Sequence, residues 1–278
     1  MSKCIAVTDL NLDDITLAIY KPTIPAAKKT DTVQLVLCYK GVPLNKDTKF
    51  QFGSQAAPLA CWGGLQYFDT AQKKFPTVQS SADLGCFAAV APSQKGKTCN
   101  LRVDLRLTDD ASGQAAINFW NRIEQLHMDA YMRGIDGAEV LPNLVDKPLD
   151  KRKDMLEALD GNYYYRLPFR PAQFDATNNR KYNPTMTMKV RAFLNTNAVR
   201  MTTPGLTVFI NGTPATDPVE ALAKPLHGRW AVCFDGPYGK CPDQKYHPPC
   251  NLFAALVCPI VRNPATIDMF NAELSSSE

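Results

Sequence analysis

Histidine is scarce in this 278-residue chain, which has only three: His127, His227 and His247. Few side chains are therefore suited to general acid–base catalysis near neutral pH. The signatures of common catalytic sites are missing as well. A phosphate-binding loop ending in Gly96-Lys97-Thr98 would need a glycine at position 91, where the chain has Ala91. These absences favour a protein that is not an enzyme and that carries no cofactor.

Long apolar segments are also lacking, since none approaches the roughly 20 residues that a membrane helix needs. The first residues show no basic segment followed by an apolar run, so we expect no signal peptide and an intracellular, reducing compartment. A chain of this length needs no disulfides to fold. We therefore interpret the nine cysteines as free thiols, several of them buried: Cys4, Cys38, Cys61, Cys86, Cys99, Cys233, Cys241, Cys250 and Cys258.

Positive charge is concentrated in one stretch of the chain. The net charge is only +4, yet residues 151–200 contain 10 Lys and Arg residues against 4 Asp and Glu residues. Residues 1–150 contain 16 of each kind, and residues 201–278 contain 5 basic and 7 acidic residues. A local basic patch suits a polyanion, of which nucleic acid is the commonest. On charge alone, a basic face that contacts only water is the alternative.

Short strands make up most of the predicted structure. The 21 Pro and 15 Gly residues are scattered between them as turn residues, and no stretch is typical of a linker. Apolar alternation and β-branched or aromatic residues predict the strands, over residues 15–20, 33–39, 48–52, 84–91, 101–107, 163–167, 186–194, 207–210, 229–234 and 252–261.

One long helix interrupts these strands. Apolar residues recur at helical spacing from Ala116 to Ala130. Asp109 or Asp110 can cap its first turn, and Gly134 can end it in a left-handed conformation. Strands on both sides of one helix predict a β-rich α+β fold, a barrel or sandwich with an inserted helix. Shorter helical segments are expected over Leu149–Leu159, closed by Gly161, and over Asp217–Ala223.

The basic stretch is also aromatic. It contains Tyr163-Tyr164-Tyr165-Arg166 and Phe169-Arg170, followed by Phe174 and Arg180-Lys181-Tyr182. Proteins that hold single-stranded nucleic acid combine cations for the phosphates with flat rings for the unstacked bases. The stretch as a whole favours such binding, although each ring taken singly is better explained as core and each cation as solvated surface.

The strand that follows has two unlike faces. Alternation places Met186, Met188, Val190 and Ala192 on one face, and Thr185, Thr187, Lys189, Arg191 and Phe193 on the other. The first face can pack into the core while the second presents hydroxyls, two cations and a ring. A strand face of this composition predicts a binding platform of the OB-fold kind.

Two further segments have weaker signals. Trp62-Gly63-Gly64, with Lys73-Lys74-Phe75 after it, predicts either a loop with an exposed ring or a tight turn over a buried one. Cys241, His247 and Cys250 have residue types that bind zinc, but their spacing is not that of a standard zinc site. Cys233 and Cys258 lie nearby inside predicted strands, where a buried thiol is the simpler interpretation.

The order of these motifs resembles that of a known family. Across residues 12–262, Trp62-Gly63-Gly64 and Lys73-Lys74-Phe75-Pro76 precede the helix 115–133. Then come Lys181-Tyr182-Asn183-Pro184, Met188-Lys189-Val190-Arg191, and an apolar strand with Trp230 followed by Gly236-Pro237-Tyr238-Gly239-Lys240. The layout resembles the OB-fold single-stranded-DNA-binding proteins of large DNA viruses and related phages. No motif in it is specific alone.

This resemblance implies an OB-like five-stranded barrel with an inserted long helix and peripheral strands. It implies cooperative, sequence-tolerant binding of exposed strands during replication, repair or recombination, at viral or nuclear replication sites in the cytoplasm or nucleus. Replication proteins and further copies of the chain are implied partners. Family members often end in an acidic tail, but residues 267–278 contain only three acids, which places a tail function in doubt.

We therefore predict a single-stranded-DNA-binding domain over residues 1–265 and a short tail over 266–278. The phosphate-binding cations predicted are Lys189, Arg191, Arg180, Lys181, Arg166 and Arg170, with Lys73, Lys74, Lys97 and Arg102 as weaker candidates. The stacking rings predicted are Tyr163, Tyr165, Phe169, Tyr182 and Trp62. A structural protein such as a β-sandwich virion component, and a metal-dependent enzyme using Cys241, His247 and Cys250, are the alternatives.

Overall fold

Strands predominate in the folded chain, and the longest element is a single helix, α2 (Ala111–Arg133). No helix in the described part of the chain is long and apolar enough to cross a membrane. The computed structural model describes residues 3–20, 34–67, 74, 77–78, 98–136, 148, 151, 154, 167–194, 201–203, 205–240 and 246–260.

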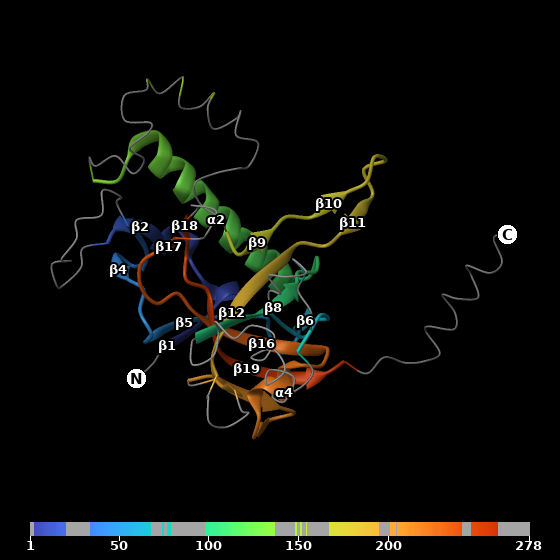
Figure 1. The fold of residues 1–278 in the computed structure, drawn as a ribbon. Coiled ribbons are helices and arrows are strands. Elements are labelled where there is room, and N and C mark those ends of the chain that lie inside the picture. Colours follow the sequence, from blue (N-terminus) through green and yellow to red (C-terminus); the bar gives the residue numbers. More distant parts are fainter. Residues whose placement is uncertain are drawn as a thin grey trace.

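One large mixed sheet organises the molecule (Figure 1). Its strands are β1 (Lys3–Ala6), β5 (Thr48–Phe52), β6 (Leu59–Cys61), β7 (Leu65–Tyr67), β8 (Thr98–Arg106), β9 (Phe169–Arg170), β12 (Thr185–Leu194), β13 (Met201–Thr202), β14 (Thr207–Ile210), β15 (Thr213–Pro214), β16 (Leu226–Cys233) and β19 (Asn251–Pro259).

Three small sheets and short helices complete the described structure. The small sheets are β2 (Ile15–Ile19) with β3 (Leu35–Tyr39) and β4 (Val42–Pro43), β10 (Gln173–Phe174) with β11 (Arg180–Tyr182), and β17 (Gly239–Lys240) with β18 (Tyr246–His247). The short helices are the 3-10 turns η1 (Val7–Asp9) and η2 (Leu12–Asp14), and the α-helix α4 (Pro218–Leu222).

Pairings within the large sheet return to their starting point. β6 pairs with β8, and β8 pairs with β12, both antiparallel. β12 meets β19 in parallel at Lys189 and Asn251, and β19 pairs antiparallel with β16. β16 then returns to β6 through Leu226–Gly228 and also pairs with β5 through Trp230–Cys233. β5 and β6 therefore lie end to end along one edge of β16.

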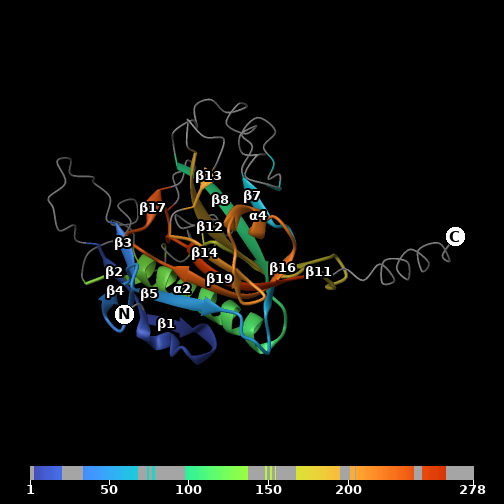
Figure 2. The same cartoon turned by 90° about the horizontal axis from the view of Figure 1, so that it is seen from below.

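The core lies between this sheet and one face of α2. Phe119, Trp120 and Ile123 of the helix are buried, and the ring of Phe119 lies 5.6 Å from that of Phe50 and 5.4 Å from that of Phe52. Figure 2 shows α2 running alongside β5, which carries those two rings. The Phe52–Phe119 pair is edge to face and the Phe50–Phe119 pair is tilted, and such aromatic contacts add stabilisation beyond area burial.

Both ends of α2 follow from local sequence. Asp110 is the N-cap, and its Oδ1 accepts a hydrogen bond of 2.8 Å from the backbone N of Gly113. At the other end Gly134 has φ 73° and ψ −174°. The positive φ was predicted, but the ψ value lies outside the left-handed helical region, so that detail of the prediction is wrong. A residue without a Cβ is still required there.

The predicted strands that fall on described residues are present, with boundaries shifted by a few residues. β16 begins before the predicted residue 229, because Gly228 inside the strand hides its pattern. The short strands were missed, since two or three residues show no periodicity. Predicted strand 84–91, residues 163–166 and most of helix 149–159 lie outside the described residues; Lys151 and Asp154 are helical.

Candidate nucleic-acid interface

The outer face of β8 and β12 is the centre of the candidate interface. The strands pair antiparallel over nine register positions, which set Arg102 opposite Lys189 and Asp104 opposite Thr187. Directly paired residues point to the same side of a sheet, so these four side chains share one face. The predicted alternation is confirmed: the residues between them on both strands are buried, Val103 and Met188 among them.

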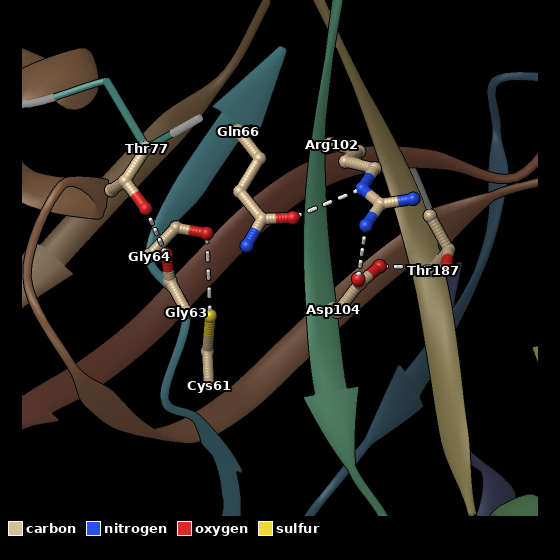
Figure 3. Close-up of polar contacts among 8 residues, drawn as sticks. All are labelled: Cys61, Gly63, Gly64, Gln66, Thr77, Arg102, Asp104 and Thr187. Atoms are coloured by element: carbon tan, nitrogen blue, oxygen red, sulfur yellow. Dashed lines mark hydrogen bonds and ion pairs between the residues drawn. The ribbon is translucent and has the colours of Figure 1, made fainter. Parts of the chain in front are cut away.

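Arg102 is fixed by a polar network on this face (Figure 3). Its Nε donates to Oε1 of Gln66 on β7 at 3.1 Å, and its Nη2 lies 3.0 Å from Oδ2 of Asp104. The Thr187 hydroxyl donates to the other carboxylate oxygen of Asp104 at 2.7 Å. The guanidinium is therefore oriented, and its charge is partly countered by Asp104.

Lys189 is brought against a segment distant in the sequence. Its backbone N donates to the carbonyl of Cys250 at 2.8 Å, and its Nζ lies 3.0 Å from Nε2 and 3.3 Å from Nδ1 of His247. An ammonium group only donates, so the imidazole accepts through a nitrogen that carries no proton. These contacts hold β18 over the outer face of β12.

A pocket of about 220 Å³ opens where the neighbour of β12 changes. The backbone N of Thr187 donates to the carbonyl of Pro168, two residues before that of Lys189 donates to Cys250. The segment before β9 thus borders the start of β12, and the segment between β18 and β19 borders its middle. Residues lining the pocket are Arg102, Leu167, Pro168, Phe169, Arg170, Thr187, Lys189, His247, Pro248 and Cys250.

The loop that carries Trp62 lies beside β7 and exposes the indole, which is 41% accessible. The Thr77 hydroxyl donates to the carbonyl of Gly63 at 3.0 Å, and Cys61 Sγ donates to that of Gly64 at 3.7 Å (Figure 3). Gly64 has φ +63°, and a Cβ there would lie 2.6 Å from the Ala223 carbonyl oxygen. Of the two sequence interpretations, the exposed ring on a held loop is therefore correct.

The hairpin β10–β11 projects from the body of the molecule (Figure 1). Phe174 and Tyr182 are 53% and 56% exposed on it, and Lys181 Nζ lies 5.5 Å from the Tyr182 ring centroid. Arg180 forms an ion pair of 2.6 Å with Asp109, just before α2. The hairpin thus carries two rings and two cations, and Arg180, the first residue after its turn, joins it to the segment before α2.

The tip of this hairpin is ordered by one carboxylate. Asp175 Oδ1 accepts from the Thr177 hydroxyl at 2.8 Å, from the Thr177 backbone N at 2.9 Å and from the Asn179 backbone N at 2.8 Å. The hydrogen bond from the Thr177 side chain, followed by that from the Asn179 backbone, lowers the pKa of Asp175. An ionised acid therefore shapes the turn.

The predicted site residues fall into separate groups. Arg102, Phe169, Arg170 and Lys189 line the pocket, and Arg180, Lys181 and Tyr182 lie on the hairpin. Arg191 is exposed two residues beyond Lys189, Trp62 lies on its loop, and Lys74 is exposed. Tyr163, Tyr165, Arg166, Lys73 and Lys97 lie outside the described residues.

Phe169 is less accessible than a stacking platform requires. It pairs with Met186, which is buried, so the two side chains point to the same side of the sheet. Its ring packs against the core, and it also borders the pocket. Phe169 can therefore contact a ligand in that pocket while its ring stays packed against the core.

Several residues of the interface were not predicted as site residues. Phe174 belongs to the basic, aromatic stretch, and that composition could have included it. Thr187 was placed on the predicted platform face by alternation but was not named as a site residue, and Gln66 and Pro248 carry no such signal. His247 had been considered only as a zinc ligand, and nothing local in its segment predicts that it reaches Lys189.

A metal site is not assembled among the described side chains. They include no group of three or more His, Cys, Asp or Glu residues placed to hold a metal ion. Cys250 is buried, and desolvation raises the pKa of its thiol, while Cys241 lies outside the described residues. Cys233 is buried as predicted for a strand thiol, but Cys258 is exposed, so that part of the prediction is wrong.

Comparisons with known proteins add a structural likeness. The chain matches no protein-family model, and no curated protein matches it. Among solved structures it is similar to gp2.5, a single-stranded DNA binding protein encoded by bacteriophage T7. The two are 12% identical over 78% of this chain and 94% of that chain, with a TM-score of 0.36. A likeness this low carries no conclusion about function, which rests on the geometry above.

Proposed function

We propose that this protein binds single-stranded DNA without strong sequence preference. The observation that carries the proposal is the outer face of β8 and β12, where Arg102 and Lys189 lie opposite each other and Arg191 follows on the same face. Exposed rings lie on segments that attach to this region: Trp62 on the loop before β7, and Tyr182 on the hairpin.

The arrangement matches the two needs of single-strand binding. Cations on an exposed sheet face can neutralise successive phosphates, and exposed rings can accept bases of any identity by stacking. A stacked ring contacts the face of a base and forms no hydrogen bonds with its edge. The binding is therefore expected to be tolerant of sequence. The activity proposed is binding alone, with no catalytic step and no cofactor.

The roles proposed follow from exposure and contacts. Phosphate contacts are assigned to Lys189, Arg191, Arg170, Arg180 and Lys181, and more weakly to Arg102 and Lys74. Stacking is assigned to Tyr182, Trp62 and Phe174, and an edge contact to Phe169. The sequence alone supports stacking roles for Tyr163 and Tyr165. It also supports phosphate contacts for Arg166, Lys73 and Lys97.

The closed order of strand pairings supports an OB-like barrel as the scaffold. β5 and β6 together, then β8, β12, β19 and β16 supply five strands, with the parallel pair between β12 and β19. We propose that residues 1–265 form this one domain and that residues 266–278 are a tail. A role in protecting strands during replication, repair or recombination, with replication proteins or further copies as partners, is part of the same proposal, at replication sites within the cell.

The test is fluorescence anisotropy of a labelled oligo-dT strand of about 30 nucleotides, longer than the roughly 4–16 that one such fold covers. The five phosphate contacts assigned above predict a loss of roughly 100-fold in affinity between about 50 and about 200 mM salt, because bound cations release counterions. Duplex DNA of the same length should compete poorly.

A matched pair of variants locates the site. Arg191→Gln should weaken oligo-dT binding and lower the salt dependence by about one phosphate contact. Lys46→Gln removes an equally exposed cation from the turn before β5 and should leave binding unchanged. If the wild-type protein does not bind oligo-dT at the lower salt, the proposal is wrong. Large homomeric particles in solution would then favour the structural-protein alternative.

A further inference from the structure

We propose that the pocket beside β12 seats a single nucleotide of the bound strand, its base among the apolar residues and its phosphate at Lys189 and Arg170. This inference rests on the proposed function and adds a defined anchoring point to it. Its basis is the geometry around Thr187, Lys189 and His247, described by the distances above.

The pocket exists because β12 has two partners along one edge. Pro168 accepts the hydrogen bond of the Thr187 backbone, and Cys250 accepts that of the Lys189 backbone, both at 2.8 Å. The two bordering segments come from opposite directions and leave a recess between them. Backbone hydrogen bonds of the sheet therefore fix both borders of the recess. A ligand bound there would contact backbone that is already ordered.

The size and apolar lining of the recess suit one flat ring system. At about 220 Å³ it is smaller than the roughly 300–1,000 Å³ that drug-sized ligands occupy. Leu167, Pro168, Phe169 and Pro248 supply apolar surface on two sides of it. A nucleobase is flat and largely apolar on its faces. One base can therefore be buried against this apolar surface while the rest of the strand stays in solvent.

The polar lining suits an anion attached to that ring. Lys189, Arg170 and Arg102 border the recess, and Asp104 counters Arg102 at 3.0 Å. Lys189 Nζ meets a neutral nitrogen acceptor, His247, at 3.0 Å. An ammonium group has three N–H donors, so the same group can donate to a phosphate oxygen beside the imidazole.

A free 5′-mononucleotide should therefore occupy the recess. We would titrate thymidine 5′-monophosphate into the isotopically labelled full chain and follow backbone amide signals by NMR. The expected result is saturable shifts confined to residues 167–170, 187–191 and 247–251. Thymidine and deoxyribose 5-phosphate, each carrying half of the ligand, should bind more weakly than the intact nucleotide, because base and phosphate are both bound.

Two variants separate this seat from strand binding in general. Lys189→Met keeps the aliphatic stem and should lower mononucleotide affinity roughly tenfold or more, and Arg170→Gln should lower it less, since Arg170 is exposed. Lys46→Met should leave it unchanged. The unfolding temperature of each variant is measured to recognise a loss of fold. If Lys189→Met is unfolded, the mononucleotide affinity of Arg170→Gln decides whether the pocket binds the phosphate.

The possible failures can be told apart. If oligo-dT binds but the mononucleotide shifts no amide around the recess, or shifts them equally in Lys189→Met, the seat is wrong while the proposed function stands. If oligo-dT does not bind at all, the proposed function fails. The proposed nucleotide site is supported if the mononucleotide displaces oligo-dT from the wild-type protein but does not displace it from Lys189→Met.

Discussion

His127 is buried on α2 although its side chain can carry a charge. It is 4% exposed, and its Nε2 lies 2.7 Å from the Tyr238 hydroxyl, with the two rings edge to face. Desolvation lowers the pKa of His127 from 6.5 to about 3. The imidazole is therefore neutral in the folded protein, and it joins the helix to the segment that follows β16.

Acid should destabilise the protein through His127. Because its pKa is lowered on folding, the unfolded chain binds the extra proton, and stability falls as pH falls from 6.5 towards 3. Between pH 6.5 and about 5 this residue alone should cost about 2 kcal/mol of unfolding free energy. Urea unfolding over this range should show a smaller pH dependence in His127→Gln. An equal dependence in variant and wild type would contradict this account.

At the scale of single elements, the hairpin β10–β11 combines exposed rings with an ion pair to the body of the molecule. Phe174 and Tyr182 are both more than half exposed, and Arg180 on β11 pairs with Asp109. Exposed large apolar side chains are informative when they gather on one projecting element. Here they gather on an element that also carries cations.

Removing the hairpin rings should affect binding without affecting stability. Each base–ring stack is worth about 1–3 kcal/mol, so Tyr182→Ala and Phe174→Ala should each weaken oligo-dT binding several-fold or more. Their thermal unfolding should match that of the wild type, because neither ring is buried. Val42→Ala, which removes a side chain 61% exposed on β4, is the control and should change neither quantity. Unchanged affinity in the double variant would remove the hairpin from the interface.

At the scale of the whole molecule, the closed order of pairings depends on one close approach of backbones. A Cβ on Gly228 of β16 would lie 2.2 Å from the Leu256 carbonyl oxygen of β19. The position after β5 is also close, since a Cβ on Gly53 would lie 2.5 Å from the Gly228 carbonyl oxygen. The absence of side chains at Gly53 and Gly228 allows β16 to pair with β5, β6 and β19 at the same time.

Gly228→Ala should therefore destabilise the entire fold. Overpacking typically costs about 1–3 kcal/mol, and the upper end of that range is expected here because backbone atoms must move to admit the new methyl group. Circular dichroism melting should show one transition at a markedly lower temperature. Gly212→Ala is the control, because it has φ +82° but open space around it and should cost only the roughly 1–2 kcal/mol of a left-handed backbone conformation. Equal losses in the two variants would refute the packing explanation.

Local patterns allowed several elements to be predicted from the sequence. The alternation around Val103 and Met188 predicted which side chains of β8 and β12 are buried, since a strand turns successive residues to opposite faces. The cap at Asp110 and the end of α2 at Gly134 depend only on residues within a turn of each other. The outer-face positions of Lys189 and Arg191 follow from the same alternation.

Other features depend on strands that meet from distant parts of the chain. Only the tertiary structure places His247 against Lys189, forms the pocket, exposes Trp62 and packs Phe169 against the core. Neighbouring strands pair through uniform backbone groups, so sequence period specifies the faces of a strand but not its partner. By itself the sequence determined the β-rich class, the capped helix and the cationic strand face. Which segments border that face was decided by packing and long-range pairing.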